Sequence, residues 1–199
     1  MSEVRGIIFD MDGTLVDSRL DFDAMRREMG LPVGTSILEG LATVPYGPIR
    51  EQMLNTMRIH ELRGADAAVL FEGVTEFLDH IDELGIVAAV LTRNSRESTD
   101  RTLDRLKLSF SQVVTREDAP PKPDPTGVKM IAERWGLPTH QVIVIGDYLF
   151  DLQAGRRAGM RSILFAPNML PHFADEADYV LRNFRDAGSL LHELQQGRA

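Results

Sequence analysis

The stretch FDMDGTLVDS, residues 9–18, places Asp10 and Asp12 two positions apart, where a mostly aliphatic run, residues 4–9, gives way to glycine. An Asp-Gly step alone is weak evidence of function, because this pair is a common turn former. Two carboxylates this close repel each other, which shifts their pKa values and favours a bound cation. The stretch therefore predicts a buried strand that ends at a site which holds a metal ion or divides acid and base roles.

The spacing of the acids excludes a calcium-binding loop. Such a loop requires D-x-D-x-D-G, whereas here glycine comes one residue after the second acid and Leu15 stands where the invariant glycine belongs. A calcium loop also follows a helix, and the residues before Asp10 indicate a strand.

The composition describes an acidic chain of ordinary size. Its 199 residues, 43% of them hydrophobic, suffice for one domain with a modest insertion. The formal net charge of −8 disfavours nucleic acid and anionic membranes as partners, since both require a dense basic patch. The absence of cysteine excludes a thiolate nucleophile, a disulfide and cysteine-ligated zinc. No apolar run is long enough to span a membrane, and a strand that begins by about residue 4 leaves no room for a signal peptide, so we expect a cytoplasmic protein.

Apolar segments alternate with amphipathic ones along most of the chain. Helical spacing of apolar residues is found over residues 74–84 and over 124–135. Short aliphatic runs predict strands at residues 4–10, 86–92, 111–115, 141–146 and 161–165. These strand-helix units predict an α/β fold with a doubly wound, mostly parallel sheet.

Residues 18–72 interrupt this alternation. They contain no convincing strand, and glycines and prolines divide them into helical pieces at about 20–29, 35–42, 48–63 and 65–71. We therefore expect a small α-helical cap, residues 18–72, inserted after the first strand of a core formed by residues 1–17 and 73–199.

Polar residues follow four of the predicted strands. In an open α/β sheet, chemistry gathers at the carboxyl ends of the strands, so these residues are expected at one edge of the sheet. They are Asp10 and Asp12 after the first strand, Thr92 after the second, Lys122 in the loop after the third, and Asp147 and Asp151 after the fourth.

Four short motifs built on these residues resemble those of the haloacid dehalogenase-like superfamily. D-x-D-G-T-L-V-D-S is similar to its first motif, the threonine of LTRN to its second, the lysine of PKPDP to its third, and G-D-x-x-x-D to its fourth. The resemblance covers nearly the whole chain. It is strongest to phosphatases with a small helical cap, in particular the phosphoglycolate phosphatase-like subgroup, and it implies the same core and cap.

The resemblance implies roles for the acidic residues. Asp10 would be the nucleophile that forms an aspartyl-phosphate, and Asp12 would be the general acid and then the general base. Mg²⁺ would be held by Asp10, by the backbone carbonyl of Asp12 and by Asp147. Asp151 would support this metal site without being one of its principal ligands.

The resemblance also implies how the phosphoryl group is held and which reaction follows. Thr92 and Lys122 would bind the phosphoryl oxygens. An acid at position 12 favours phosphoryl transfer, since the dehalogenases of the superfamily lack it. The implied function is a Mg²⁺-dependent phosphatase acting on a small phosphorylated metabolite, as a monomer or homodimer. A phosphomutase using the same residues, and a catalytically silent binding or regulatory protein of the same fold, remain alternatives.

Two further expectations concern the surroundings of this site. Arg93 stands where many relatives have asparagine; it either adds a positive group to the pocket or turns outward, and we expect the outward orientation. The loop VPYGPIR, residues 44–50, is stiffened by two prolines, and its Tyr46 and Arg50 are the residues expected to select the substrate.

Overall fold

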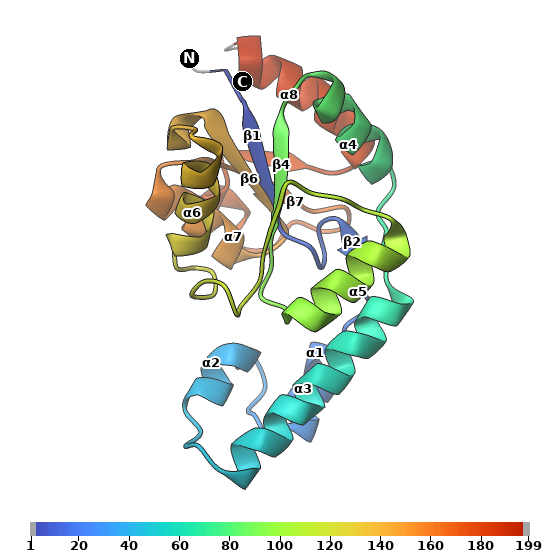
Figure 1. The fold of residues 1–199 in the computed structure, drawn as a ribbon, viewed down its shortest axis with the longest axis vertical. Coiled ribbons are helices and arrows are strands. Elements are labelled where there is room, and N and C mark those ends of the chain that lie inside the picture. The colour runs from blue at the N-terminus through green and yellow to red at the C-terminus, as the bar shows by residue number, and fades with distance from the viewer. Residues whose placement is uncertain (1–2, 197–199) are drawn as a thin grey trace.

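The core of the molecule is a six-stranded parallel sheet with helices on both faces (Figure 1). The computed structural model describes residues 3–196, and residues 1, 2 and 197–199 of the predicted core lie outside that range. The strand order is β5-β4-β1-β6-β7-β8. The strands are β1 (Gly6–Phe9), β4 (Val87–Leu91), β5 (Gln112–Val114), β6 (Val142–Gly146), β7 (Arg161–Phe165) and β8 (Tyr179–Leu181). The predicted α/β fold with a doubly wound parallel sheet is confirmed.

Different helices cover the two faces of the sheet. Ile7 and Phe9 of β1 pack in one cluster with α4 (Val74–Glu83) and α8 (Ala187–Gln196). Ile8, between them, packs in another cluster with α6 (Thr126–Trp135) and α7 (Leu149–Ala158). Because successive side chains of a strand point to opposite faces, both sets are buried and the strand is apolar throughout.

Between β1 and β4 the chain forms the helical insertion that the sequence predicts. Its helices are α1 (Phe22–Glu28), α2 (Ile37–Ala42) and α3 (Pro48–Ala67). Its two ends meet in a short antiparallel ladder of β2 (Val16–Asp17) and β3 (Val69–Leu70). The proposed division into a core and a cap of residues 18–72 falls at this ladder.

The helix predicted over residues 48–63 is longer in the structure, where it forms α3. Gly64 was expected to end a helix and residues 65–71 to form another, but α3 continues to Ala67. An added Cβ at Gly64 would lie 2.8 Å from Leu20 Cδ2, so this glycine allows close packing of the helix rather than ending it. The short strands β2, β3 and β8 were also missed, because two or three residues carry too little periodicity to be recognised.

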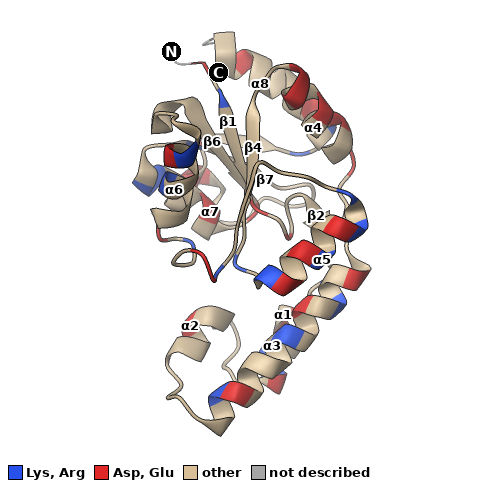
Figure 2. Cartoon of the chain, viewed as in Figure 1, with Lys and Arg blue, Asp and Glu red and all other residues tan. Residues whose placement is uncertain are grey.

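The insertion is anchored to the core by α5 (Arg96–Leu106), which lies beside α3 (Figure 1). Charged residues of both signs line the two helices (Figure 2), and Arg58 on α3 pairs with Glu97 on α5 at 2.6 Å. Asp66 on α3 likewise pairs with Arg101 on α5 at 2.6 Å. These pairs are half-exposed, so they orient the two helices more than they stabilise them.

The remaining described elements are short 3-10 turns at Thr139–Gln141, Ala174–Glu176 and Phe184–Asp186. Within residues 3–196, no helix is both long and apolar enough to cross a membrane.

Candidate active site

Asp10 and Asp147 follow neighbouring strands, at the point where the sheet order changes direction. From β1 the sheet continues to β4 and β5 on one side and to β6, β7 and β8 on the other. The backbone N–H of Asp10 donates to the carbonyl of Ile145 at 2.8 Å, which places Asp10 beside the end of β6. Ligands of open α/β sheets bind in the crevice at such a point.

The turn after β1 brings Gly13 against the Asp147 carboxylate. Gly13 has a φ of +83°, in the left-handed region, and an added Cβ would lie 2.2 Å from Asp147 Oδ2. The hydroxyl of Thr14 donates to Asp147 Oδ1 at 3.4 Å. Only glycine therefore fits this turn without moving the carboxylate.

Gly13→Ala should reduce Mg²⁺ affinity by about tenfold or more, because the new Cβ displaces Asp147. Isothermal titration with Mg²⁺ measures the affinity. Gly85→Ala is the matched control, since Gly85 has a φ of +68° but nothing within 4 Å of an added Cβ. The control carries the backbone strain of about 1 kcal/mol without the clash, and should bind Mg²⁺ like the wild type. Equal affinities of the two variants would contradict this role of Gly13.

Lys122 is buried between two carboxylates. Its side-chain ammonium donates to Asp10 Oδ1 and to the carbonyl of Leu91, the latter at 2.7 Å, and it lies 2.6 Å from Asp151 Oδ1. Asp151 lies in the first turn of α7, where its other oxygen accepts the backbone N–H of Tyr148 at 3.1 Å. Asp151 therefore orients Lys122, which in turn contacts Asp10.

One lysine faces three carboxylates here. Oxygens of Asp10, Asp147 and Asp151 lie within 4.8 Å of one another. Burial raises the pKa of Asp10 to about 7, opposed by Lys122 and increased further by Asp151. Burial, and then the charges of Asp10 and Asp151, raise the pKa of Asp147 as well. A set of oxygen donors with excess negative charge suits a hard divalent cation, so the residues present fit Mg²⁺.

Asp12 has different partners from Asp10. Its Oδ2 accepts the side-chain amide of Asn94 at 2.6 Å. Burial raises its pKa to about 6, opposed by hydrogen bonds from Ser18 and Asn94. The two aspartates of the opening motif thus differ in environment: one belongs to the lysine-carboxylate cluster, and the other is oriented by an amide.

Thr92 and Asn94 form one unit after β4. The backbone N–H of Thr92 donates to the carbonyl of Val114 at 3.0 Å, and its buried hydroxyl accepts the backbone N–H of Asn94 at 3.1 Å. The hydroxyl hydrogen of Thr92 is then available for a ligand. The sequence analysis assigned no role to Asn94, since its contact with Asp12 spans 82 positions.

Glu61 was not anticipated at all. It lies on α3 and is buried, its carboxylate accepts the hydroxyl of Ser95 at 2.8 Å, and it pairs with Arg116. Its charge also contributes to the raised pKa of Asp12. In the sequence it resembles any acidic residue on a helix, and only packing against α5 reveals it.

The outward orientation expected for Arg93 is wrong. Its guanidinium donates to the carbonyl of Lys122 at 2.9 Å and lies over the ring of Phe150, 4.7 Å from the centroid. It also binds both carboxylate oxygens of Glu39 on α2, at 2.6 and 2.7 Å. Arg93 therefore connects the sheet edge to the insertion, a pairing that the spacing of 54 positions conceals.

The structure does not bring Tyr46 and Arg50 to the other site residues. The loop between α2 and α3 lies at the end of the insertion away from the sheet (Figure 1), and Tyr46 in this loop is 94% exposed. Arg50 donates to the carbonyls of Leu41 and Val44, and its guanidinium lies over the ring of Tyr46. Arg50 lies in the first turn of α3, and from there it holds the carboxyl end of α2.

A pocket of about 450 Å³ lies between the strand ends and the insertion. Its lining includes every predicted catalytic, phosphate-binding and metal-binding residue, together with Asp151. These residues are Asp10, Asp12, Thr92, Lys122 and Asp147. Neither Tyr46 nor Arg50 lines it.

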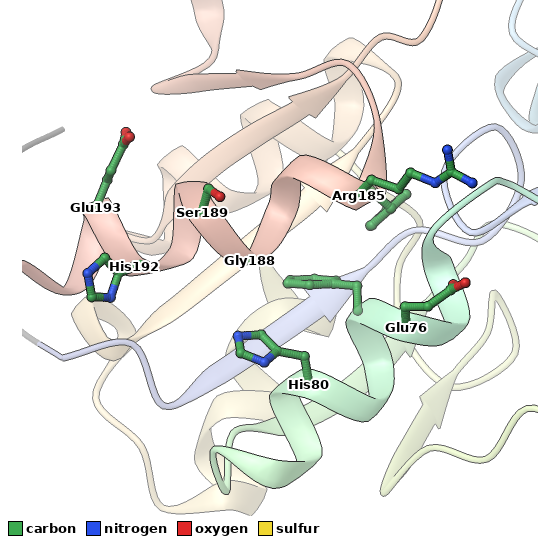
Figure 3. Close-up of a pocket in the computed structure, with 9 residues that line it drawn as sticks. Glu76, His80, Arg185, Gly188, Ser189, His192 and Glu193 are labelled. Atoms are coloured by element: carbon green, nitrogen blue, oxygen red, sulfur yellow. The ribbon is translucent and has the colours of Figure 1, made fainter.

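A second hollow, of about 620 Å³, lies between α4 and α8 (Figure 3). Its ionisable side chains are spread along the two helices and the 3-10 turn before α8, with Glu76 and Arg185 at one end and His192 at the other. Arg185 is already paired with Glu72 at 2.7 Å. The first pocket, where charged groups converge, is the better candidate for an active site.

Comparison with known proteins identifies the class to which this fold and site belong. A model of the haloacid dehalogenase-like hydrolase family matches residues 23–165, a range that contains Thr92, Lys122 and Asp147 and begins after Asp12. Because the match covers more than half of the chain, the chain belongs to the haloacid dehalogenase-like hydrolase family.

Individual relatives agree with this assignment. The chain is 30% identical to a phosphoglycolate phosphatase of Pseudomonas syringae pv. tomato, over 79% of this chain and 67% of that protein. It is 28% identical to the pyrophosphatase PpaX of Bacillus velezensis, over 95% of both chains. A crystal structure of a hydrolase from Pseudomonas syringae has the same fold, with a TM-score of 0.81, 24% identity and coverage of 96% of this chain and 99% of that one.

Proposed function

We propose that this protein is a Mg²⁺-dependent phosphatase that hydrolyses a small phosphomonoester through an aspartyl-phosphate on Asp10. The observation that carries the proposal is the unequal environment of Asp10 and Asp12. A nucleophile and a general acid-base group must act at adjacent points on one substrate, and two carboxylates held by different partners can take the two roles. The phosphatase names of the relatives support the same reaction class.

Asp10 and Asp12 act in turn during formation and hydrolysis of the aspartyl-phosphate. A carboxylate oxygen of Asp10 attacks phosphorus, and the ester oxygen leaves with a proton from Asp12. Water then attacks the aspartyl-phosphate and gives a proton to Asp12, which releases phosphate and regenerates both carboxyl groups. Asn94 keeps Asp12 directed at the leaving oxygen.

Two donors hold the phosphoryl group during both steps. Lys122 is fixed by Asp151 and the carbonyl of Leu91, and it contacts the nucleophile itself. Thr92 can direct its hydroxyl hydrogen at a phosphoryl oxygen, because its oxygen already accepts from Asn94. Preorganised donors of this kind stabilise the charge that develops on the transferring group.

Asp10, Asp147 and the backbone carbonyl of Asp12 would hold the Mg²⁺ ion. When bound, the ion supplies positive charge that reduces the repulsion between the anionic nucleophile and the anionic phosphate. Asp151 contributes indirectly, through Lys122.

Asp12→Asn separates the two steps and tests the mechanism. With an alkyl phosphate, which needs a proton on its leaving group, turnover should fall by about 100-fold or more. With p-nitrophenyl phosphate, whose leaving group needs no proton, the first step should persist while hydrolysis of the intermediate slows. A burst of nitrophenol and a protein mass increased by one phosphoryl group are then expected.

Asp10→Asn is the control for this experiment, since it should show neither the burst nor the added mass. Equal losses on both esters without a phosphorylated protein would contradict the assignment of Asp12.

A measurement of free phosphate and free alcohol in the wild-type reaction separates hydrolysis from isomerisation. A phosphomutase would yield an isomeric phosphate ester and little free phosphate or free alcohol.

A further inference from the structure

The insertion contributes its own wall to the active-site pocket. Most of this wall is apolar, and the insertion residues that form that part are Leu20, Phe22, Met25, Ile37, Leu38 and Met57. The same wall carries three polar residues. They are Arg26, Ser36, whose hydroxyl makes no capping bond to α2, and Glu61, whose carboxylate is already paired with Arg116. The strand-end residues opposite hold the phosphoryl group, so the insertion faces the leaving half of the substrate.

Three cations line this pocket among the described residues, and two of them already have carboxylate partners at close range. Lys122 is held by Asp10, Asp151 and the carbonyl of Leu91. Arg93 binds both carboxylate oxygens of Glu39 and a backbone carbonyl. In the proposed mechanism Lys122 serves the phosphoryl group, and Arg93 would have to give up Glu39 to bind another anion.

Arg26 is the third cation, and it has a donor to spare. Its Nη1 donates to the carbonyl of Thr35 at 3.3 Å and its Nη2 to Asp23 at 2.8 Å. Its Nε is buried and has no acceptor. The side chain of Asp23 is 65% exposed, so this pair is solvent-screened and easily exchanged for another anion. A guanidinium has five N–H donors, and these two contacts use one hydrogen on each Nη, so the second hydrogen on each Nη remains for a ligand oxygen.

We propose that Arg26 binds an anionic group on the leaving half of the substrate, a carboxylate or a second phosphate. The inference rests on the proposed phosphatase function and deepens it. The substrate class is then a phosphomonoester whose leaving group joins an anion to a carbon skeleton that packs against the apolar wall. The pocket volume of about 450 Å³ is within the range of sites that enclose whole metabolites, which leaves room beyond the phosphoryl group.

Three esters of similar size test the proposal: phosphoglycerate with a carboxylate, propanediol bisphosphate with a second phosphate, and glycerol phosphate with neither. The wild type should show kcat/KM at least about tenfold higher for one of the two esters that carry a second anionic group than for glycerol phosphate. The preferred one identifies the anion. Arg26→Gln should remove this preference, mainly through KM, while Arg26→Lys should retain part of it.

Arg27→Gln is the matched control, because Arg27 is the next residue of α1, is exposed and does not line the pocket. It should leave all three values unchanged. Equal losses of Arg26→Gln on all three esters would show that Arg26 only supports the fold, and absence of a preference in the wild type would equally overturn the inference. Both results leave the phosphatase intact. If the wild type released no phosphate from these esters or from p-nitrophenyl phosphate, the proposed function itself would fail, and the inference with it.

Discussion

Asp10→Asn should lower the turnover rate by about 10⁴-fold or more. The variant should still fold, with a stability equal to or above that of the wild type. The amide cannot act as the nucleophile, which explains the loss. Stability should not suffer, because burial raises the pKa of Asp10 to about 7 and the ionised form is therefore disfavoured in the metal-free fold at pH 8. Lys122 keeps Asp151 and the carbonyl of Leu91 as partners. Steady-state phosphate release and thermal unfolding without metal measure the two effects.

Glu97→Gln is a control for the stability of Asp10→Asn, because the pKa of Glu97 is shifted in the opposite direction from that of Asp10. A hydrogen bond from Arg58 lowers the pKa of Glu97, so its charged form is favoured in the fold. Removing that charge should leave stability unchanged or slightly reduced, and activity intact. Asp10→Asn with appreciable activity in a clean preparation, or with a melting temperature well below that of the wild type at pH 8, would contradict the role and the environment assigned to Asp10.

Removal of Mg²⁺ by EDTA should stop the reaction, and added Mg²⁺ should restore it.

The metal should also stabilise the protein more at pH 8 than at pH 5. A carboxyl group whose folded pKa is raised contributes stability that is complete below its unfolded pKa of about 4 and is lost as the pH rises through the folded value. That value is about 6 for Asp12 and about 7 for Asp10, so the metal-free protein should lose stability between about pH 4 and pH 7.

Bound Mg²⁺ should reverse this loss, because it interacts with the ionised carboxylates. At 100 times the dissociation constant it would add about 2.7 kcal/mol, a rise in melting temperature of roughly 5–10 °C for a chain of this size. Thermal unfolding with and without Mg²⁺ at both pH values measures it. The same titration with Asp10→Asn, matched for ionic strength, should show most of the effect lost. An equal Mg²⁺ effect at pH 5 and pH 8 would exclude binding through these carboxylates.

Local sequence determined much of this protein. Apolar strands covered on both faces have a continuous hydrophobic signal, so residues 4–10 and 141–146 were recognisable without any partner strand. The edge of the sheet at which Asp10 and Asp147 gather followed from topology, since parallel strands place their carboxyl ends together. The helical insertion was recognisable because it interrupts the alternation of strands and helices.

Tertiary structure decided the groups that the insertion brings to the site. Glu61 and Arg26 of the insertion line the pocket, and Glu39 of the insertion pairs with Arg93 of the core. The sequence does not show which way such charged side chains point. Tyr46 and Arg50 had a suggestive local composition, yet neither lines the pocket: Tyr46 is exposed, and Arg50 binds the carbonyl of Val44. Short motifs thus indicate the residues at the strand ends. The selection of the leaving group that we propose depends on how the insertion packs over them, and contacts across tens of positions have no local signature.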